Sequence, residues 1–538
     1  EEARSDAYFW RGESYYRKGE YGNAISDYRT YQNNTQQKGT DMYALSFYNL
    51  GYCYFKQQEY DMALNRFRQY TDVEQNHAAA SYADAYNRIG DCLFHNRQFA
   101  AAEENYNKAS QVLPSAGDYS VYQKGFVLGL QKDYNGKIQA MDQLIREYPE
   151  SQYIDDALFE KGRTYVLLEN SSSAIQTFNK LIGEYPESSL ARKAGIQLGL
   201  IYYNDNQPEK AAEAYKQVIS KYPGSEEAKV ALQDLKSVYI DLNDIDAYAA
   251  YVNSLGGNIH LNINEQDSLT YIAAEKLFMR GDNEGARRSM QNYLQNYPNG
   301  AFSTNANFYL ASIAFNLKEY NEALPMFEQV IASGDRKFLE ESTARKAEIE
   351  YLTENFKAAL ETFKRLNEIA ESADNKEAAS LGIMRCALKE GNQKDALLAG
   401  ANQLLKNPKV SPEIANEARY VRAKAYMEMD QESKALADLK LISQDTRTAQ
   451  GAEAKYLLAQ LYYDANDDKN AEKVLEEFAK NGTPHQYWLA RGFILWADIY
   501  IRKGDPVQAR VYLNSLQKNY QGDDNITEMI ESRLAKLK

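Results

Sequence analysis

Few residues of this 538-residue chain have the types and the spacing that catalysis or metal binding requires. The sequence contains no His-Glu-x-x-His pair, no Cys-x-x-Cys pair and no glycine-rich phosphate loop. Asp241, Asp244 and Asp246 form a short acidic loop, but they lack the further spaced ligands and the glycine of a calcium loop. The four histidines are scattered along the chain: His77, His95, His260 and His485. We therefore expect no catalytic residues, no metal site and no cofactor, and we predict that the protein is not an enzyme.

Composition and charge indicate a helical protein that does not bind nucleic acid. Gly (29) and Pro (11) are scarce, whereas the good helix formers Ala, Leu, Lys, Glu and Gln are abundant. Asp and Glu (76) outnumber Lys and Arg (62), and the net charge of −14 disfavours binding to phosphate backbones or to anionic lipid. No apolar run approaches the roughly 18–20 residues of a membrane helix. We expect neither a nucleic-acid partner nor a transmembrane segment.

The elements that would position any functional residue repeat about every 37 residues. We number the repeats so that position 8 is a small residue, with a turn seven residues later and an alanine at position 20. Position 8 holds Gly12, Gly51, Gly90, Gly125, Gly162, Gly199, Lys236, Ala274, Ala311, Ala347, Met384, Ala423, Ala459 and Ala497. Position 20 holds Ala24, Ala63, Ala102, Lys137, Ala174, Ala211, Tyr248, Ala286, Ala323, Ala359, Ala396, Ala435, Ala471 and Ala509. Fourteen repeats in step are more than random placement would give.

The spacing within a repeat predicts two helices joined by a turn. Apolar residues at positions 7 and 11, such as Leu50 and Tyr54, lie one turn apart on one face of the first helix. Positions 20, 24 and 27, such as Ala63, Phe67 and Tyr70, follow the same rule in the second helix. The small residues at positions 8 and 20 let the two helices approach closely, and large neighbours then fill the remaining space.

Prolines mark where the predicted helices begin and end. Six prolines stand at position 32, where the missing N–H and the clash with the preceding turn end the second helix: Pro114, Pro149, Pro186, Pro223, Pro298 and Pro408. Pro208 and Pro506 stand at position 17, where a first-turn proline starts the second helix. Pro325 falls inside a second helix, within its opening turns. The serines after Tyr-Pro-Glu corners, Ser151 and Ser188, are placed to cap the next helix.

This arrangement resembles the tetratricopeptide repeat. The family pattern has small residues at positions 8 and 20, tyrosine at 11, an aromatic residue at 24 and proline at 32. Gly199, Tyr202, Ala211, Tyr215 and Pro223 match it in full. The resemblance implies an all-α solenoid of about fourteen helix-turn-helix units that binds proteins or peptides.

The repeats are longer than the 34 residues typical of this family, and the extra residues lie beside the Tyr-Pro-x-Ser corners. The longer spacing is similar to that of bacterial envelope proteins. Examples are the lipoprotein of the β-barrel assembly machinery, the periplasmic factor that coordinates the Tol-Pal system, and long tetratricopeptide-repeat proteins of Bacteroidetes-type bacteria. The resemblance implies a location in the periplasm or at the outer membrane, with the cytoplasm as the alternative.

The seventh repeat interrupts the pattern. It has Lys236 and Tyr248 at the two small positions and then runs into Gly256-Gly257. We therefore expect an N-terminal array of repeats 1–7 in residues 1–256 and a C-terminal array of repeats 8–14 in residues 257–538. Apolar residues alternate over 259–263, which is a weak signal of a strand or an extended linker.

The two ends of the chain differ in how they cover the stack. Residues 523–538 place apolar side chains on one face and predict the cap helix that a stack requires. No similar cap precedes Asp6. We therefore expect that the natural protein extends further at its N-terminus, and that any association with the outer membrane occurs through that region.

The cysteines all fall at position 10, where other repeats carry Val, Ile or Leu: Cys53, Cys92 and Cys386. We expect small buried hydrophobic residues with free thiols. Cys53 and Cys92 occupy equivalent places in adjacent repeats, whose helices should lie about 8–10 Å apart. A disulfide tolerates a Cα–Cα distance of only about 7 Å.

A stack of this kind presents its first helices on an inner surface, and the resemblance implies that positions 2, 5, 9 and 12 face a groove there. Exposed aromatic residues in such a groove would anchor a partner, because they bury a large area at low entropic cost. The densest clusters form the candidate groove: Phe9, Tyr16, Tyr48, Tyr52, Phe55, Tyr271, Phe278, Phe308 and Phe315. The alternative is that these rings pack against the neighbouring repeat.

The sequence therefore favours a noncatalytic scaffold that binds a protein or peptide partner within an envelope assembly complex. A second hypothesis is a binding protein or enzyme that holds glycan or peptidoglycan fragments on the same aromatic residues. A third is a cytoplasmic regulator built of the same repeats. The first hypothesis is preferred because no acid–base or nucleophile set emerges.

Overall fold

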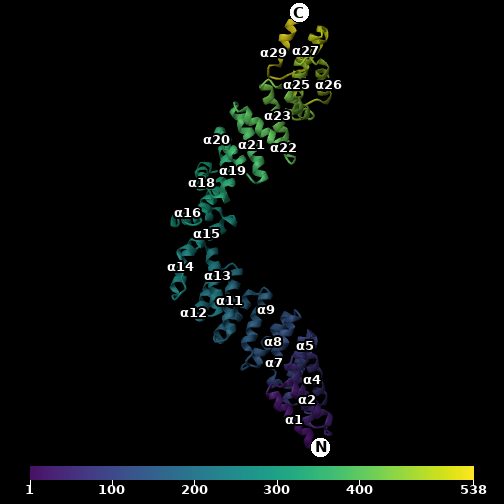
Figure 1. The fold of residues 1–538 in the computed structure, drawn as a ribbon, viewed down its shortest axis with the longest axis vertical. Helices are drawn as coiled ribbons and strands as arrows, with labels where there is room; N and C mark the ends of the chain where they lie inside the picture. The colour runs from purple at the N-terminus through teal and green to yellow at the C-terminus, as the bar shows by residue number, and fades with distance from the viewer. Residues whose placement is uncertain (538) are drawn as a thin grey trace. The chain divides into compact units, whose positions relative to one another are not determined.

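The computed structural model describes residues 1–537, and these form α-helices, one short 3₁₀ turn (η1, Pro114–Ala116) and no strand. The predicted all-α class is confirmed. Within each of the two units described below, the helices follow one another in chain order, and each packs against the next (Figure 1). Each repeat predicted from the sequence is one pair of consecutive helices.

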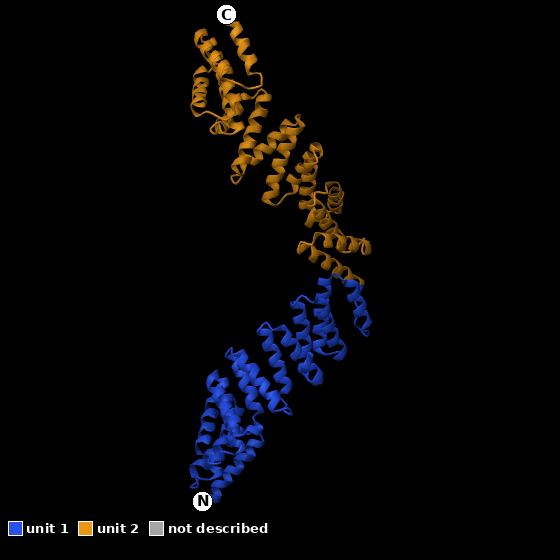
Figure 2. Ribbon diagram, turned by 180° about the vertical axis from the view of Figure 1, so that it is seen from behind, with its two compact units in different colours: residues 1–262 blue, residues 263–538 orange. Residues whose placement is uncertain are grey.

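The chain divides into two compact units, residues Glu1–Asn262 and Ile263–Lys538 (Figure 2). Unit 1 contains repeats 1–7: α1 (Glu2–Arg17), α2 (Tyr21–Asn34), α3 (Asp41–Lys56), α4 (Tyr60–Val73), α5 (Ala80–His95), α6 (Phe99–Val112), α7 (Asp118–Leu130), α8 (Tyr134–Glu147), α9 (Ile154–Leu167), α10 (Ser171–Glu184), α11 (Ser189–Asn204), α12 (Pro208–Lys221), α13 (Glu226–Leu242) and α14 (Ile245–Ser254). Residues 255–262 join the two units without regular structure, so the alternation over 259–263 is not a strand.

Unit 2 contains repeats 8–14 and one further helix. Its helices are α15 (Ile263–Met279), α16 (Asn283–Asn296), α17 (Ser303–Asn316), α18 (Tyr320–Ser333), α19 (Arg336–Leu352), α20 (Phe356–Ile369), α21 (Ala373–Glu390), α22 (Lys394–Lys406), α23 (Pro412–Glu428), α24 (Glu432–Ile442), α25 (Ala449–Asp464), α26 (Asp468–Asn481), α27 (Gln486–Arg502), α28 (Pro506–Asn519) and α29 (Ile526–Lys536). Helix α29 lies within the residues predicted to form a cap, and it buries Ile526 and Ile530.

Glycine at position 8 makes room for a large ring at position 24 of the same repeat. A Cβ atom on Gly162 would lie 2.5 Å from Phe178, and one on Gly199 would lie 2.4 Å from Tyr215. Real Cβ atoms do not approach other atoms so closely, and the ring of Phe178 is fully buried. The backbone of the first helix therefore lies directly on the ring.

Repeats 13 and 14, which have alanine at position 8, have a smaller partner at position 24. In repeat 13, Ala459 at position 8 is combined with Leu475 at position 24. In repeat 14, Ala497 is combined with Leu513, and all four side chains are buried. The extra methyl group of alanine is thus matched by a smaller partner in these repeats, as close packing requires.

Repeat 11 corrects one assignment made from the sequence. In other repeats the N–H of the alanine at position 20 donates to the carbonyl of the residue that precedes the second helix. In repeat 11 the N–H of Leu397, and not that of Ala396, makes this bond, to the carbonyl of Gln393. Leu397 is buried and Ala396 is only half-buried. The turn of this repeat contains one additional residue, and the close approach moves to Gly400, where a Cβ atom would meet the carbonyl oxygen of Ser380.

The turn between the two helices shares one feature in all fourteen repeats, although the turn of repeat 11 is one residue longer. The seventh residue after position 8 has a positive φ in each, as the predicted turn implies. Four of these residues are glycines: Gly19, Gly281, Gly391 and Gly504. The other ten carry side chains in the left-handed region, which is strained for most residues: Gln58, Arg97, Lys132, Glu169, Asn206, Asn243, Lys318, Glu354, Asp430 and Asn466.

The proline predictions are confirmed. Each of the six second helices with a proline at position 32 ends two residues before it, Pro208 and Pro506 begin α12 and α28, and Pro325 lies inside α18. Ser188 caps α11 by accepting from the N–H of Leu190. Ser151 does not cap a helix directly, because α9 begins only at Ile154.

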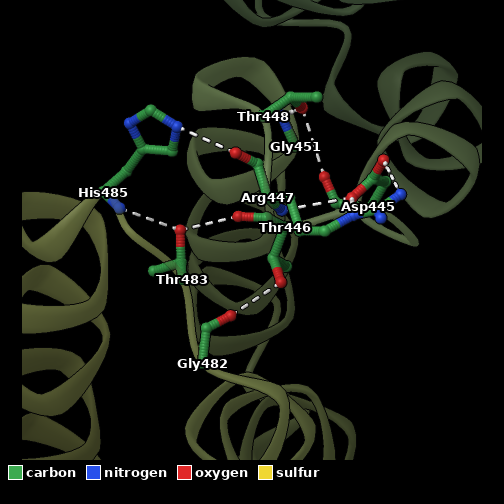
Figure 3. A network of polar contacts seen from close by, with 8 residues as sticks. All are labelled: Asp445, Thr446, Arg447, Thr448, Gly451, Gly482, Thr483 and His485. Atoms are coloured by element: carbon green, nitrogen blue, oxygen red, sulfur yellow. Dashed lines mark hydrogen bonds and ion pairs between the residues drawn. The ribbon is translucent and has the colours of Figure 1, made fainter.

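Polar contacts join the corners of neighbouring repeats. The hydroxyls of Ser151 and Ser188 donate to Asp118 and Asp155, both 33 residues earlier in the chain. At the corners that end repeats 12 and 13, the Thr446 hydroxyl donates to the carbonyl of Gly482, and the Thr483 hydroxyl donates to the carbonyl of Thr446 (Figure 3). These corners fix the spacing of successive repeats.

The three cysteines are buried and free of disulfides, as expected from their position. Burial raises the pKa of each thiol, to about 12. A thiol in this state is a packing residue and not a nucleophile.

Candidate binding face of the first helices

The candidate site is the surface formed by positions 2, 5, 9 and 12 of successive first helices, which we call the first-helix face. The nine aromatic residues predicted there are not freely exposed. Phe9 and Tyr271 are buried, with 4 % and 3 % of their surface accessible, and the other seven are half-buried. Their role in partner binding stays a prediction.

In four repeats the tyrosine hydroxyl at position 5 is hydrogen-bonded to position 2 of the next repeat. The Tyr48 hydroxyl donates to Asp84 at 2.7 Å, and the Tyr52 hydroxyl donates to the same oxygen. Tyr420 likewise donates to Glu453. In two other repeats the direction is reversed, and the hydroxyl accepts: Tyr271 from Asn305 and Tyr456 from Arg491. These tyrosines therefore tie each first helix to the following one.

The phenylalanines of the candidate groove pack against other rings or cations. Phe308 stacks on Phe338 of the next repeat at 4.6 Å between ring centroids. Phe278 lies 4.7 Å from Tyr309 of the next repeat. The Arg345 guanidinium lies 4.8 Å from the ring of Phe315. The alternative considered from the sequence, packing against the neighbouring repeat, thus describes the surroundings of these rings.

Burial raises the pKa of Tyr48 and Tyr52 above the ordinary value of 10, and the Asp84 carboxylate raises both further. A phenol next to a carboxylate keeps its proton because ionisation would place two negative charges together. The two hydroxyls therefore remain hydrogen-bond donors at every physiological pH, and the bonds between the helices persist.

A second polar cluster connects repeats 3 and 4. Asp91 accepts from the hydroxyls of Tyr106 at 2.7 Å and Tyr119 at 2.9 Å, and Arg88 lies 2.6 Å from its other oxygen. Burial raises the pKa of Asp91. All four groups face one another and not an open space, so the cluster holds helices together.

Two cavities open on the first-helix face, and sequence reasoning did not find either. One, of about 440 Å³, lies between α19 and α21 above Phe363 and Leu366. Its walls include Ala344 and Leu381 at position 5, where other repeats have aromatic rings. The hollow exists because small side chains replace large ones. The missing aromatic residue at position 5 was the signal in the sequence.

The second cavity, of about 450 Å³, is lined by residues of α7, α8, α9 and α11. Gly129 lines it at position 12, where eight other repeats have Tyr or Phe. Lys137, the lysine found at position 20 instead of alanine, enters the same cavity and pairs with Glu160 at 2.6 Å. Both cavities fall within the range of about 300–1,000 Å³ that ligand sites occupy.

Among residues 1–537, no helix is both long and apolar enough to cross a bilayer. Within the same residues, no group of three or more His, Cys, Asp or Glu side chains is arranged to hold a metal ion.

Three solved structures are similar to parts of this chain at low identity. The C-terminal part of a tetratricopeptide-repeat protein from Cytophaga hutchinsonii is 16% identical, with a TM-score of 0.36, over 55% of this chain and 98% of that one. PilF of Pseudomonas aeruginosa is 16% identical, with a TM-score of 0.32, over 43% and 97%. PilW, described as a widely conserved type IV pilus biogenesis factor, is 18% identical, with a TM-score of 0.32, over 42% and 98%. Similarity at this level bears on neither partner nor function.

Family models of the tetratricopeptide repeat match five stretches of unit 1, whereas no curated protein matches the chain. One model matches residues 6–34, 119–151, 156–188 and 194–225, and another matches residues 48–114. The helix pairs with close contacts at positions 8 and 20 continue beyond these stretches into unit 2. Unit 1 therefore carries tetratricopeptide repeats, and the resemblance seen in the sequence is confirmed there.

Proposed function

We propose that this protein is a noncatalytic scaffold that binds an extended segment of a protein partner along the first-helix face. The cavities between successive first helices carry this proposal, because they are open and large enough for side chains, and the one between α19 and α21 is mostly apolar. Tetratricopeptide repeats are in general protein-binding scaffolds. The half-buried rings of Tyr16, Tyr52, Phe55 and Phe315 would form walls along the same face.

The hydrogen bonds between successive first helices support this role, because a binding surface gains affinity when it is rigid before the partner binds. Tyr48, Tyr271, Tyr420 and Tyr456 each connect consecutive first helices through a hydroxyl. Successive helices therefore present their side chains in a fixed order to an incoming chain.

The glycan hypothesis receives less support. A sugar platform needs an open ring face, whereas the rings of Phe308 and Tyr271 are stacked on Phe338 and Phe302. A protein segment can use the cavities instead.

Site-specific crosslinking tests the proposal. A photoreactive residue replaces Leu167, which is 62 % exposed at the rim of the α7–α9 cavity, or Met62, which is 40 % exposed on the second helix α4. We expect the Leu167 probe to capture one defined segment of one protein, and this segment as a synthetic peptide to compete. Equal capture at Met62, or no competition, would refute the proposal.

We also propose that the scaffold acts in a bacterial cell envelope. The long repeats and the corners Tyr148-Pro149-Glu150-Ser151 and Tyr185-Pro186-Glu187-Ser188 support this. Fractionation of the source cells tests the location. Recovery with periplasmic or outer-membrane markers is expected, and recovery with cytoplasmic markers would favour the cytoplasmic regulator instead.

A further inference from the structure

Repeat 4 departs from the other repeats at two positions that face each other. It has Lys137 at position 20, where eleven repeats have alanine, and Gly129 at position 12, where eight repeats have Tyr or Phe. A Cβ atom on Gly129 would lie 2.7 Å from Cδ of Lys137. The glycine therefore provides the space through which a lysine of the second helix reaches the first-helix face.

The lysine is buried in a polar pair next to a ring. Only 8 % of Lys137 is exposed, and its Nζ lies 2.6 Å from Oε2 of Glu160. The same Nζ lies 5.6 Å from the centre of the Phe126 ring. Replacing alanine by a buried lysine carries a desolvation penalty that a packing role does not explain, because an uncharged residue, alanine in eleven repeats, fills this position in all the others.

The surroundings of the pair combine apolar surface with one excess positive charge. Leu130, Val166 and Leu167 line the cavity and are exposed by 46 %, 38 % and 62 %. Arg163 also lines it, with 57 % of its side chain exposed. Lys137 and Arg163 together carry two positive charges against the single negative charge of Glu160. The cavity is thus positive in a chain whose net charge is −14.

We propose that this cavity, the Lys137 pocket, binds an internal segment of a protein partner in which an Asp or Glu side chain is flanked by bulky apolar side chains. The carboxylate meets Arg163 and Lys137, and the apolar neighbours cover Leu130 and Leu167. This inference rests on the proposed function and specifies the partner's chemistry.

The geometry favours an internal acidic residue over a chain terminus. The pocket is lined by three successive first helices, with Phe126 on α7, Arg163 on α9 and Gln197 on α11. A bound segment therefore crosses the pocket and continues over the next helix. Binding is expected to weaken with ionic strength, because an exposed arginine contributes to it.

The first experiment measures binding of defined peptides to the full chain by fluorescence anisotropy. The probes are amidated peptides with a Leu, Ile, Phe or Tyr on each side of one Asp or Glu, between Gly-Ser flanks. Matched probes have Asn or Gln at the centre. Charge-assisted hydrogen bonds contribute about 1.5–3 kcal/mol, so the acidic probes are expected to bind at least about tenfold more tightly.

Variants locate the binding. Lys137→Met with Arg163→Gln removes both positive charges that meet the carboxylate but keeps much of each side-chain stem. Lys137→Ala with Gly129→Phe restores the pattern of the ordinary repeats and is expected to keep the fold, as thermal melting will show. Lys161→Met is the control, because Lys161 lies on α9 as Arg163 does but pairs with Asp142 of α8, outside the pocket.

Loss of the acidic preference in both double variants, with Lys161→Met unchanged, supports the proposal. Absence of binding, equal binding of the amide probes, or binding unaffected by the double variants overturns it. Tighter binding of an apolar peptide whose only carboxylate is its free C-terminus also overturns it. If the Leu167 crosslink captures a competing partner segment without an acidic residue, the proposed function stands and this inference fails.

Discussion

Single residues set how closely the helices of a repeat approach. The Gly162–Phe178 contact and the Ala459–Leu475 pairing are two solutions of the same packing problem, one with a small first residue and a large ring, the other with both of intermediate size. The effect of substituting one member of a pair on stability therefore depends on the size of the other member.

Gly162→Ala is expected to lower the free energy of unfolding by about 1–3 kcal/mol, because the new methyl group overlaps the buried Phe178 ring. Adding Phe178→Leu recreates the alanine–leucine combination of repeat 13 and should recover part of the loss. Denaturant titration of both single variants and the double variant measures the coupling. A double variant no more stable than Gly162→Ala would contradict the pairing.

Two carboxylates predict opposite effects of pH. Burial, with Asp155 and Glu160 nearby, raises the pKa of Asp156, so its ionisation in the folded state is unfavourable. Its contribution to stability is complete below the unfolded pKa of about 3.9 and is lost as the pH rises through the folded pKa. Asp156→Asn should therefore stabilise the protein at pH 7 but not at pH 3, as thermal melting at both values will show.

Glu340 is the opposite case, because its pKa is lowered in the folded protein. The Asn375 side chain and the N–H groups of Glu371 and Ser372 donate to it and lower its pKa. Its contribution is present above the unfolded pKa and disappears as the pH falls through the folded pKa. Glu340→Gln should destabilise the protein at pH 7, with a smaller effect at pH 3. The same pH dependence in both variants would show that the assigned causes are incorrect.

At the scale of elements, the turn between the two helices is a recurring source of strain. Ten of the fourteen turns hold a residue other than glycine at positive φ. The chain tolerates this because the turn N–H groups and the flanking helices fix the backbone there, as in the bond from Asn170 N–H to the Tyr165 carbonyl.

Glu169→Gly is expected to raise the free energy of unfolding by up to about 1 kcal/mol, since glycine adopts φ of 55° without strain. The gain is reduced by the greater flexibility of glycine in the unfolded chain. Gly504→Ala, at φ of 79°, is the reverse substitution and should destabilise by a similar amount. Chemical denaturation of the two variants measures both; a loss of stability in Glu169→Gly would contradict the turn geometry.

At the scale of the whole molecule, the chain consists of two compact units joined by residues 255–262. Gly256 and Gly257 in this segment both have positive φ and are exposed. Exposed segments without regular structure are the preferred sites of proteolytic cleavage.

Limited proteolysis is expected to cut first within residues 255–262 and to leave two resistant fragments, near residues 1–255 and 262–538. Mass spectrometry of the early products identifies the cut. First cleavage inside a repeat, such as at a corner of unit 1, would show that the repeats are less stable than the division into units implies.

The sequence by itself determined the helix pairs, their register and their ends. Small residues at positions 8 and 20, and prolines such as Pro186 and Pro208, act through short-range sterics that every repeat reproduces, so they can be read without coordinates. Repeat 11 was misplaced by one residue because an additional turn residue leaves a plausible alanine, Ala396, beside the true position of Leu397.

Only the tertiary structure decided which parts of the first-helix face are open. The sequence placed Tyr48 and Phe308 on that face, but their exposure depends on the neighbouring repeat. There the Tyr48 hydroxyl donates to Asp84, and the Phe308 ring stacks on Phe338. Hollows occur where a small residue replaces an aromatic ring on that face, as at Gly129 and Ala344. Whether a side chain fills such a space is set by contacts between residues distant in sequence, which a repeat pattern does not contain.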